Sequence, residues 1–285
     1  IQLTQMLFRP LRQIADKFNT LQMGMVAVQR VFAVMDTDSY IPDEGDLETK
    51  QIKGEISFQN VVFSYKENEP VINDISFDVR AGETIAIVGA TGAGKSTIIN
   101  LLSRFYDINQ GVISVDGNNI KSYKLSSLRN AIAVVLQDVF LFADTIYNNI
   151  TLWDSEISEE DVMEAAKHIG IDRFISKLPG KLQYDVKERG AMLSGGQRQL
   201  IAFLRAYVTN PSILILDEAT SSVDGETEEL IRIATDCLTK DKTAIIIAHR
   251  LATIQKADRI IVLDKGKIVE MGTHEKLLKM DGGFY

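Results

Sequence analysis

One nine-residue stretch constrains this chain more than any other: Gly89-Ala90-Thr91-Gly92-Ala93-Gly94-Lys95-Ser96-Thr97. It fits the pattern G-x-x-x-x-G-K-[ST] and stands between a short apolar, β-branched segment, 84–88, and a helical sequence. Glycines here let backbone N–H groups close around phosphate oxygens, and the N-terminus of the helix adds a partial positive charge. We therefore predict a phosphate-binding loop at 89–97, in which Lys95 neutralises β- and γ-phosphates and Ser96 binds Mg²⁺.

A pair of acidic residues follows the apolar segment 213–216. In α/β proteins, ligands bind at the carboxyl ends of the parallel strands. Asp217 is therefore expected to hold Mg²⁺, directly or through water, and Glu218 to take a proton from an attacking water. A strand that simply ends in two solvated acids would give the same pattern. The phosphate loop upstream favours the functional interpretation.

Predicted strands and helices alternate through most of the chain. Asp264-Lys265-Gly266 has the composition of a hairpin turn between the last two strands. The alternation predicts an α/β domain with a mixed core sheet, largely parallel, and antiparallel strands at its two ends. Strand patterns lie at 56–65, 71–79, 84–88, 112–115, 131–136, 213–216, 243–248, 259–263 and 267–271, and helical patterns at 159–168, 196–208 and 226–238.

The first 36 residues predict a long amphipathic helix. Their apolar residues recur alternately every four and every three positions, with polar residues between them. Two interpretations stay open: the helix packs on its own domain, or it pairs with a helix of another chain or of missing sequence. A polar linker is expected at 37–53, followed by the domain at 54–285.

Composition narrows the choice of function. Lys and Arg number 31 against 39 Asp and Glu, a formal net charge of -8, which argues against a broad nucleic-acid-binding face. Cys237 is the single cysteine, so no intrachain disulfide is possible. No apolar run approaches the roughly 18 to 20 residues that span a bilayer. Because the sequence lacks an initiator Met, we expect it to be a fragment of a longer protein.

Leu193-Ser194-Gly195-Gly196-Gln197 resembles the signature motif of ATP-binding cassette (ABC) ATPases. The other marks of that family follow, and the resemblance covers about 54–280. Tyr65 matches the aromatic residue that stacks on adenine, and Val71 joins it in the nucleotide-binding set. Gln137 matches the Q-loop, 222–224 with Asp224 the D-loop, and His249 the switch histidine.

The resemblance implies a P-loop NTPase fold of ABC type, with antiparallel edge strands and a helical subdomain at about 138–209. It also implies ATP and Mg²⁺ as ligands, the metal being held by Ser96, Gln137 and Asp217. Lys95, Gln137, Glu218 and His249 would be the catalytic residues, with Glu218 polarising water and His249 contacting the γ-phosphate.

Within the family, the chain is similar to the nucleotide-binding domain of a half-size exporter. The segment 140–150 resembles the exporters' segment after the Q-loop, and 188–190 their loop that senses the coupling helices. Helix 1–36 is similar to the cytosolic extension of the last transmembrane helix. The resemblance thus implies a membrane domain upstream and a place at the cytoplasmic face of a membrane.

The family likeness also implies dimerisation. Residues 194–196 open a second helix with small residues, which makes a second anion-binding end. One ATP bound in the phosphate loop would not need both of these helix N-termini from the same chain. In the family, Ser194, Gly195, Gly196, Gln197 and Asp224 would complete the site of the opposite subunit, so that two ATP lie between head-to-tail domains.

Two other functions compete with the exporter motor. A soluble ABC ATPase acting on nucleic acid or ribosomes would carry a long coiled-coil insertion or a second cassette, and 98–192 holds an ordinary α/β pattern instead. A non-hydrolysing regulatory module would be expected to lack Glu218 or His249. The D-loop Ser-Ser-Val-Asp, and Leu200 and Leu204 after the signature, depart from the commoner family residues. These departures leave open whether the chain forms a homodimer or a heterodimer.

Overall fold

The computed structural model describes residues 2–37, 40–49, 52–217, 225–248, 251–280 and 283–285. Its contacts divide the chain into two units, Ile1–Pro42 and Asp43–Tyr285. Within the described residues, no helix is both long and apolar enough to cross a membrane. Part of the expected linker, 43–49, belongs to the larger unit: the carboxylate of Asp43 accepts a hydrogen bond from the Leu125 backbone N–H at 2.8 Å, and Leu47 pairs with Tyr123.

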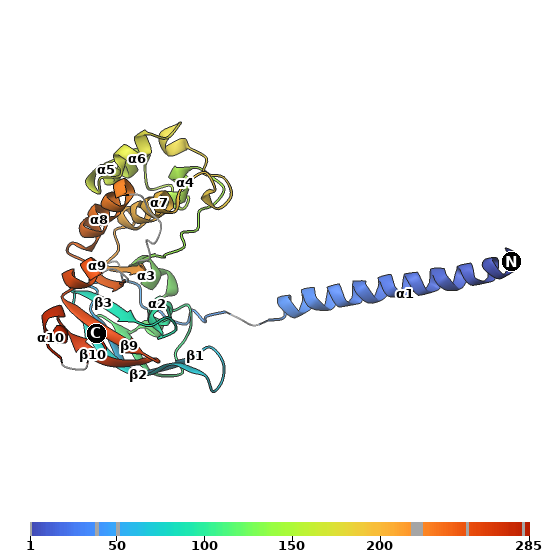
Figure 1. The fold of residues 1–285 in the computed structure, drawn as a ribbon, viewed down its shortest axis with the longest axis horizontal. Coiled ribbons are helices and arrows are strands. Elements are labelled where there is room, and N and C mark those ends of the chain that lie inside the picture. The colour runs from blue at the N-terminus through green and yellow to red at the C-terminus, as the bar shows by residue number, and fades with distance from the viewer. Residues whose placement is uncertain (1, 38–39, 50–51, 218–224, 249–250, 281–282) are drawn as a thin grey trace. The chain divides into compact units, whose positions relative to one another are not determined.

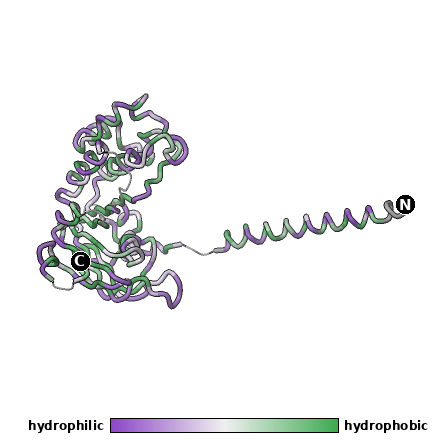
Figure 2. The backbone as a smooth tube through the Cα atoms, viewed as in Figure 1, coloured by the Kyte–Doolittle hydropathy of each residue, from purple (hydrophilic) through white to green (hydrophobic). Residues whose placement is uncertain are grey.

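The smaller unit contains the predicted N-terminal helix, α1 (Gln2–Met35). Apolar and polar residues alternate along it, as the hydropathy colouring shows (Figure 2). From Leu11 to Met35, the apolar side chains of the stripe are exposed, with Phe18 at 60% and Phe32 at 54%. The structure therefore confirms the predicted helix, and no other part of the described unit covers its apolar face.

The larger unit contains two sheets (Figure 1). The mixed sheet has the order β10-β9-β3-β8-β7-β6, with all neighbours parallel except the β9–β10 hairpin. The antiparallel sheet has the order β2-β1-β4-β5. This confirms the α/β class and the antiparallel edge. The strands are β1 (Ile56–Ser64), β2 (Pro70–Val79), β3 (Thr84–Gly89), β4 (Gln110–Val115), β5 (Asn118–Asn119), β6 (Ile132–Val135), β7 (Ile213–Asp217), β8 (Thr243–Ile247), β9 (Arg259–Asp264) and β10 (Lys267–Gly272).

Helices complete the larger unit, and they include the three that the sequence predicted at 159–168, 196–208 and 226–238. Ser158 caps α5 through a reciprocal capping box with Asp161, which explains the sharp start of that helix. The helices are α2 (Lys95–Leu102), α3 (Leu125–Asn130), α4 (Ile146–Thr151), α5 (Glu159–His168), α6 (Asp172–Ser176), α7 (Gly195–Val208), α8 (Gly225–Thr239), α9 (Leu251–Lys256) and α10 (His274–Leu278), with single 3₁₀ turns at Ile120–Ser122, Lys181–Gln183 and Glu188–Gly190.

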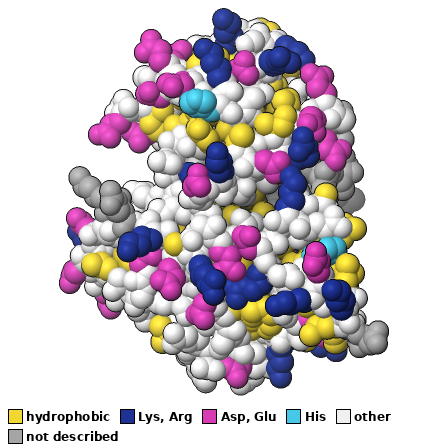
Figure 3. Space-filling model, turned by 90° about the vertical axis from the view of Figure 1, so that its left-hand side faces the viewer, with side chains coloured by type: hydrophobic (Ala, Val, Ile, Leu, Met, Phe, Trp, Pro, Cys, Tyr) yellow, Lys and Arg dark blue, Asp and Glu magenta, His cyan; other side chains and the backbone are white. Residues whose placement is uncertain are grey.

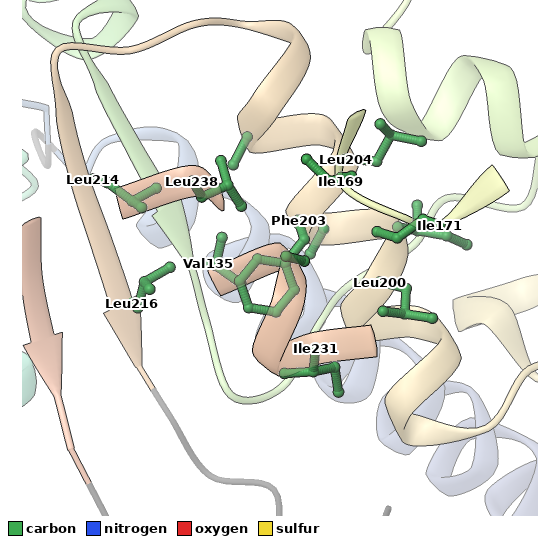
Figure 4. Close-up of a cluster of buried hydrophobic side chains, with 14 of the residues drawn as sticks. Val135, Ile169, Ile171, Leu200, Phe203, Leu204, Leu214, Leu216, Ile231 and Leu238 are labelled. Carbon is green, nitrogen blue, oxygen red and sulfur yellow. The ribbon is translucent and has the colours of Figure 1, made fainter. Parts of the chain in front are cut away.

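The mixed sheet separates two hydrophobic cores. Successive residues of a strand point to opposite faces, so Ile213 and Ile215 of β7 join the core with α2 and the antiparallel sheet. Leu214 and Leu216 join the other core, where they meet Phe203 of α7 (Figure 4). Strands covered on both faces read as continuous apolar runs, which is why β7 and β8 lack alternation.

The surface of the larger unit mixes both signs of charge. On the face drawn in Figure 3, acidic and basic side chains are interspersed rather than gathered into a patch of one sign. The larger unit also holds ion pairs, such as the salt bridge of 2.7 Å between Lys256 and Asp236. Such exposed pairs stabilise a fold by less than about 1 kcal/mol each.

Candidate nucleotide-binding site

The phosphate loop joins β3 to α2, as predicted, and its glycines occupy conformations that side chains resist. Gly92 and Gly94 have φ of 82° and 103°. A Cβ on Gly89 would lie 2.3 Å from the carbonyl oxygen of Leu263, and one on Gly94 would lie 2.7 Å from Cδ1 of Ile72. The loop can therefore follow this path only with glycine at these positions.

Lys95 begins α2 and folds back across the phosphate loop. Its Nζ donates hydrogen bonds to the carbonyl oxygens of Gly89 at 2.8 Å and Ala90 at 3.0 Å. Burial lowers the pKa of this ammonium, and the nearby Asp217 carboxylate opposes that shift. The loop thus holds one positive charge beside its own backbone N–H groups, which suits an anion.

A hairpin that the sequence analysis did not include in the site supports the phosphate loop. Gly266, in the predicted β9–β10 turn, donates its N–H to the carbonyl of Ala93 at 3.1 Å. Its own carbonyl accepts from Asn73 at 2.8 Å. Lys265 and Gly266 both have positive φ, 46° and 75°, as a two-residue hairpin requires. The sequence predicts the turn, but nothing in the turn residues predicts its contact with the phosphate loop.

The carboxyl ends of neighbouring strands bring the predicted metal residues to one edge of the sheet. Asp217, half-buried, ends β7, and the exposed Gln137 lies just beyond β6. β6 and β7 are adjacent and parallel, and β8 alone separates β7 from β3 and its phosphate loop. Ser96 is exposed at the start of α2. Asp217, at the end of β7, and Gln137, just after β6, therefore lie at the same sheet edge as the phosphate loop.

Tyr65 follows β1 and reaches α2. Its hydroxyl donates to Oγ1 of Thr97 at 3.2 Å and accepts from Nδ2 of Asn100 at 3.3 Å. The residue is 46% exposed. Val71 is half-buried on β2, beside Ile72. The aromatic residue predicted to meet the base is therefore tied to the helix that carries the phosphate loop.

The signature residues open α7. Ser194 and Gln197 form a reciprocal capping box: the serine hydroxyl accepts from the Gln197 N–H at 3.2 Å, and the glutamine amide oxygen accepts from the Ser194 N–H at 3.0 Å. Ser194 and Gly195 are exposed, and Gly196 is buried. This helix N-terminus, with its partial positive charge, faces outward.

The segment 140–150, after Gln137, is built around a buried amide. Asn149 is fully buried. Its Oδ1 accepts from the Phe142 N–H at 2.8 Å, and its Nδ2 donates to the carbonyls of Phe142 at 3.0 Å and Thr145 at 2.9 Å. Arg205 of α7 donates to the Asn149 carbonyl at 2.8 Å. One side chain thus fixes the path of the loop.

Three predicted site residues lie outside the described part of the chain: Glu218, Asp224 and His249. Glu218 follows directly on β7, and His249 comes shortly after β8 in the sequence. Their roles stay predictions.

The family model described as ABC transporter matches residues 72–221, which is more than half of the chain. The chain belongs to the ABC transporter family. The match runs through the phosphate loop, Gln137, the signature and Asp217, so the geometry above is that of an ABC domain. Domains of this family bind ATP.

Curated relatives agree over nearly the whole chain. An uncharacterized ABC transporter ATP-binding protein, YknV of Bacillus subtilis, is 47% identical over 98% of this chain and 46% of its own length. An ATP-dependent lipid A-core flippase of Idiomarina loihiensis is 47% identical over 98% of this chain and 48% of its own. The chain therefore spans about half the length of the curated relatives it matches.

A solved structure gives the same result for the fold. A bacterial Atm1-family ABC exporter with ATP bound matches with a TM-score of 0.81 and 41% identity, over 98% of this chain and 49% of that one. Because the coverage includes α1, the ABC domain and its preceding helix both have counterparts in that exporter.

Proposed function

We propose that the ABC domain is the ATP-hydrolysing motor of an exporter, which closes head-to-tail with a second such domain around two ATP. The observation that carries this proposal is the phosphate loop with Lys95 folded into it, at the same sheet edge as Asp217 and Gln137. Relatives named as exporters and flippases support the transport assignment.

In the proposed reaction, the chain positions the triphosphate and neutralises its charge, as phosphoryl transfer requires. Lys95 leaves the carbonyls of Gly89 and Ala90 and binds the β- and γ-phosphates. Glu218 orients and polarises the attacking water, and His249 holds the γ-phosphate. Gln137 contacts the metal or the water and reports to the membrane domain.

The residues at this edge suit Mg²⁺. Ser96, Asp217 and Gln137 offer oxygen donors, which Mg²⁺ prefers. Among the residues that the structure describes, no three His, Cys, Asp or Glu side chains cluster as a metal site. Mg²⁺ is ordinarily held by one or two protein ligands together with substrate phosphates, so the donor set fits an ion that arrives with the nucleotide.

The second half of each site would come from the partner domain. Ser194 and Gly195 are exposed at the N-terminus of α7, where a phosphate is favoured by the unpaired N–H groups and the helix dipole. We propose that Ser194, Gly195, Gly196, Gln197 and Asp224 complete the opposite subunit's site.

The transport part of the proposal rests on length and on α1. The relatives are about twice as long as this chain, so we propose that a membrane domain precedes it and that the motor acts at the cytoplasmic face of a membrane. α1 would connect the two parts, and its exposed apolar stripe would then pair with a helix of another chain or of the preceding sequence.

Light scattering on Glu218→Gln, with and without ATP and Mg²⁺, tests the proposal. This variant should keep ATP affinity and lose most turnover, so ATP should shift it to twice the monomer mass. Lys95→Ala is the control and should neither bind ATP nor shift. If ATP binds without a shift in mass, this chain does not complete both sites with a copy of itself alone, and a non-identical partner or the membrane domain is needed. Unchanged turnover in Glu218→Gln would remove Glu218 as the catalytic base.

A further inference from the structure

We propose that Asn100 is a positioning residue for the nucleotide base, acting through the hydroxyl of Tyr65. The inference rests on the proposed function, because it deepens the account of the same ATP site. Neither the phosphate-loop motif, 89–97, nor the aromatic residue predicts it. Asn100 lies beyond the motif, on the second turn of α2.

The hydroxyl of Tyr65 makes two hydrogen bonds to α2. It accepts a hydrogen bond from Nδ2 of Asn100 at 3.3 Å and donates one to Oγ1 of Thr97 at 3.2 Å. Thr97 is buried, and Asn100 is half-buried. A hydroxyl that already donates its proton has no further donor to offer a base. We therefore place the contact between Tyr65 and the base on the ring.

Two further aromatic rings fix the plane of that ring. Phe63 and Tyr106 each meet Tyr65 nearly perpendicularly, with centroids 4.8 Å and 5.0 Å apart and interplanar angles of 86° and 88°. Phe63 and Tyr106 also contact each other, at 5.7 Å. Such edge-to-face contacts are favourable, but they are less directional than hydrogen bonds. The two hydrogen bonds to α2 add the restraint that the rings alone do not give.

The restraint has a direct consequence for the ligand. α2 starts at Lys95, so the same short helix carries the phosphate-binding lysine, Thr97 and Asn100. The hydroxyl bonds set the distance between the stacking ring and the phosphate loop. A nucleotide that binds the ring and the phosphate loop then meets two surfaces that are already at the right distance from each other. Less conformational entropy is therefore lost on binding. A ligand without a base gains nothing from this restraint.

The test compares ATP with inorganic tripolyphosphate, which has the phosphates and no base. Equilibrium dissociation constants for both are measured by calorimetry on the whole chain, without turnover. Asn100→Leu keeps the branched shape and the number of heavy atoms of the side chain and removes the donor. We expect it to weaken ATP binding about three- to ten-fold, because the freed Tyr65 side chain must then be ordered when the nucleotide binds, and to leave tripolyphosphate binding unchanged. Asn130→Leu, at an exposed position of α3, is the matched control and should change neither.

A double-mutant cycle shows whether Asn100 acts through Tyr65. Tyr65→Phe keeps the ring and should weaken ATP binding alone, and Asn100→Leu added to it should bring no further loss. Additive losses, no loss in Asn100→Leu, or an equal loss for tripolyphosphate would each overturn the positioning role. If the unmodified chain bound neither ligand, the proposed function itself would be refuted. If Asn100→Leu folds poorly, Tyr65→Phe removes the same hydrogen bond from the tyrosine side and serves as the test.

Discussion

The contact between the β9–β10 hairpin and the phosphate loop makes Gly266→Ala the most informative substitution. A methyl group on Gly266 would lie 2.2 Å from the carbonyl oxygen of Val71, whereas ordinary contact begins near 3.4 Å. Gly82 is a matched control, since its φ of 78° is close to the 75° of Gly266 and nothing lies within 4 Å of its Cβ position. The two substitutions share the backbone penalty and differ in the collision.

The expected magnitudes follow from this difference. Left-handed backbone disfavours Ala by about 1–2 kcal/mol, and the stiffer unfolded chain returns about 0.4–1 kcal/mol, so Gly82→Ala should destabilise by about 1 kcal/mol or less. Gly266→Ala must also move the hairpin by about 1 Å. That movement disrupts the hydrogen bonds to Ala93 and from Asn73, each contributing about 1 kcal/mol, together with the local packing. We expect about 3 kcal/mol more for Gly266→Ala.

Thermal unfolding and ATP binding together form the assay. For a domain of this size, 3 kcal/mol corresponds to a midpoint lower by roughly 6–12 °C relative to Gly82→Ala. ATP affinity, measured well below the midpoint, should fall in Gly266→Ala because Ala93 belongs to the phosphate loop, and should be kept in Gly82→Ala. Equal midpoints and equal ATP affinities in the two variants would refute the tight packing of the hairpin on the loop.

Two further predictions concern a charge and a buried amide. ATP binding needs protonated Lys95, and burial lowers the pKa of this group, so ATP affinity should fall with rising pH, starting below the ordinary lysine value of 10.5. In Lys95→Arg this loss of affinity should move to higher pH. A titration of the ATP dissociation constant against pH checks both expectations. Asn149→Leu removes three hydrogen bonds, including the one that the Phe142 N–H donates, and should destabilise by about 3 kcal/mol in thermal unfolding. Asn148→Leu, which loses one bond to Asp144, should destabilise by about 1 kcal/mol, and equal losses would contradict this account.

Short-range patterns predicted much of the fold. The strands that begin or end near Thr84, Ile213 and Thr243 were recognisable as β-branched apolar runs, and the structure pairs them in one sheet. The capped helices α5 and α7 were predicted almost to the residue, because caps and periodicity are local properties. The division of the strands between two sheets was not predicted, because strand pairing joins residues that are far apart in the sequence.

Local sequence says less about residues that act through distant partners. Residues 43–49 look like a polar linker, yet Asp43 and Leu47 bond to the segment 122–125. The composition of residues 43–49 does not distinguish a solvated linker from one whose backbone is hydrogen-bonded to the domain. The family resemblance named Tyr65 and left out Asn100, because its role depends on a contact between β1 and α2.

The sequence by itself determined the chemistry of the site: a glycine-rich loop with one lysine, an acidic pair after a buried strand, and a small-residue opening to α7. These are properties of spacing, and spacing is fixed along the chain. Only the tertiary structure decided what holds that chemistry in place, namely Gly266 against Ala93 and Asn100 against Tyr65. Such supports join residues far apart in sequence, so they depend on how the layers pack, which local periodicity does not encode.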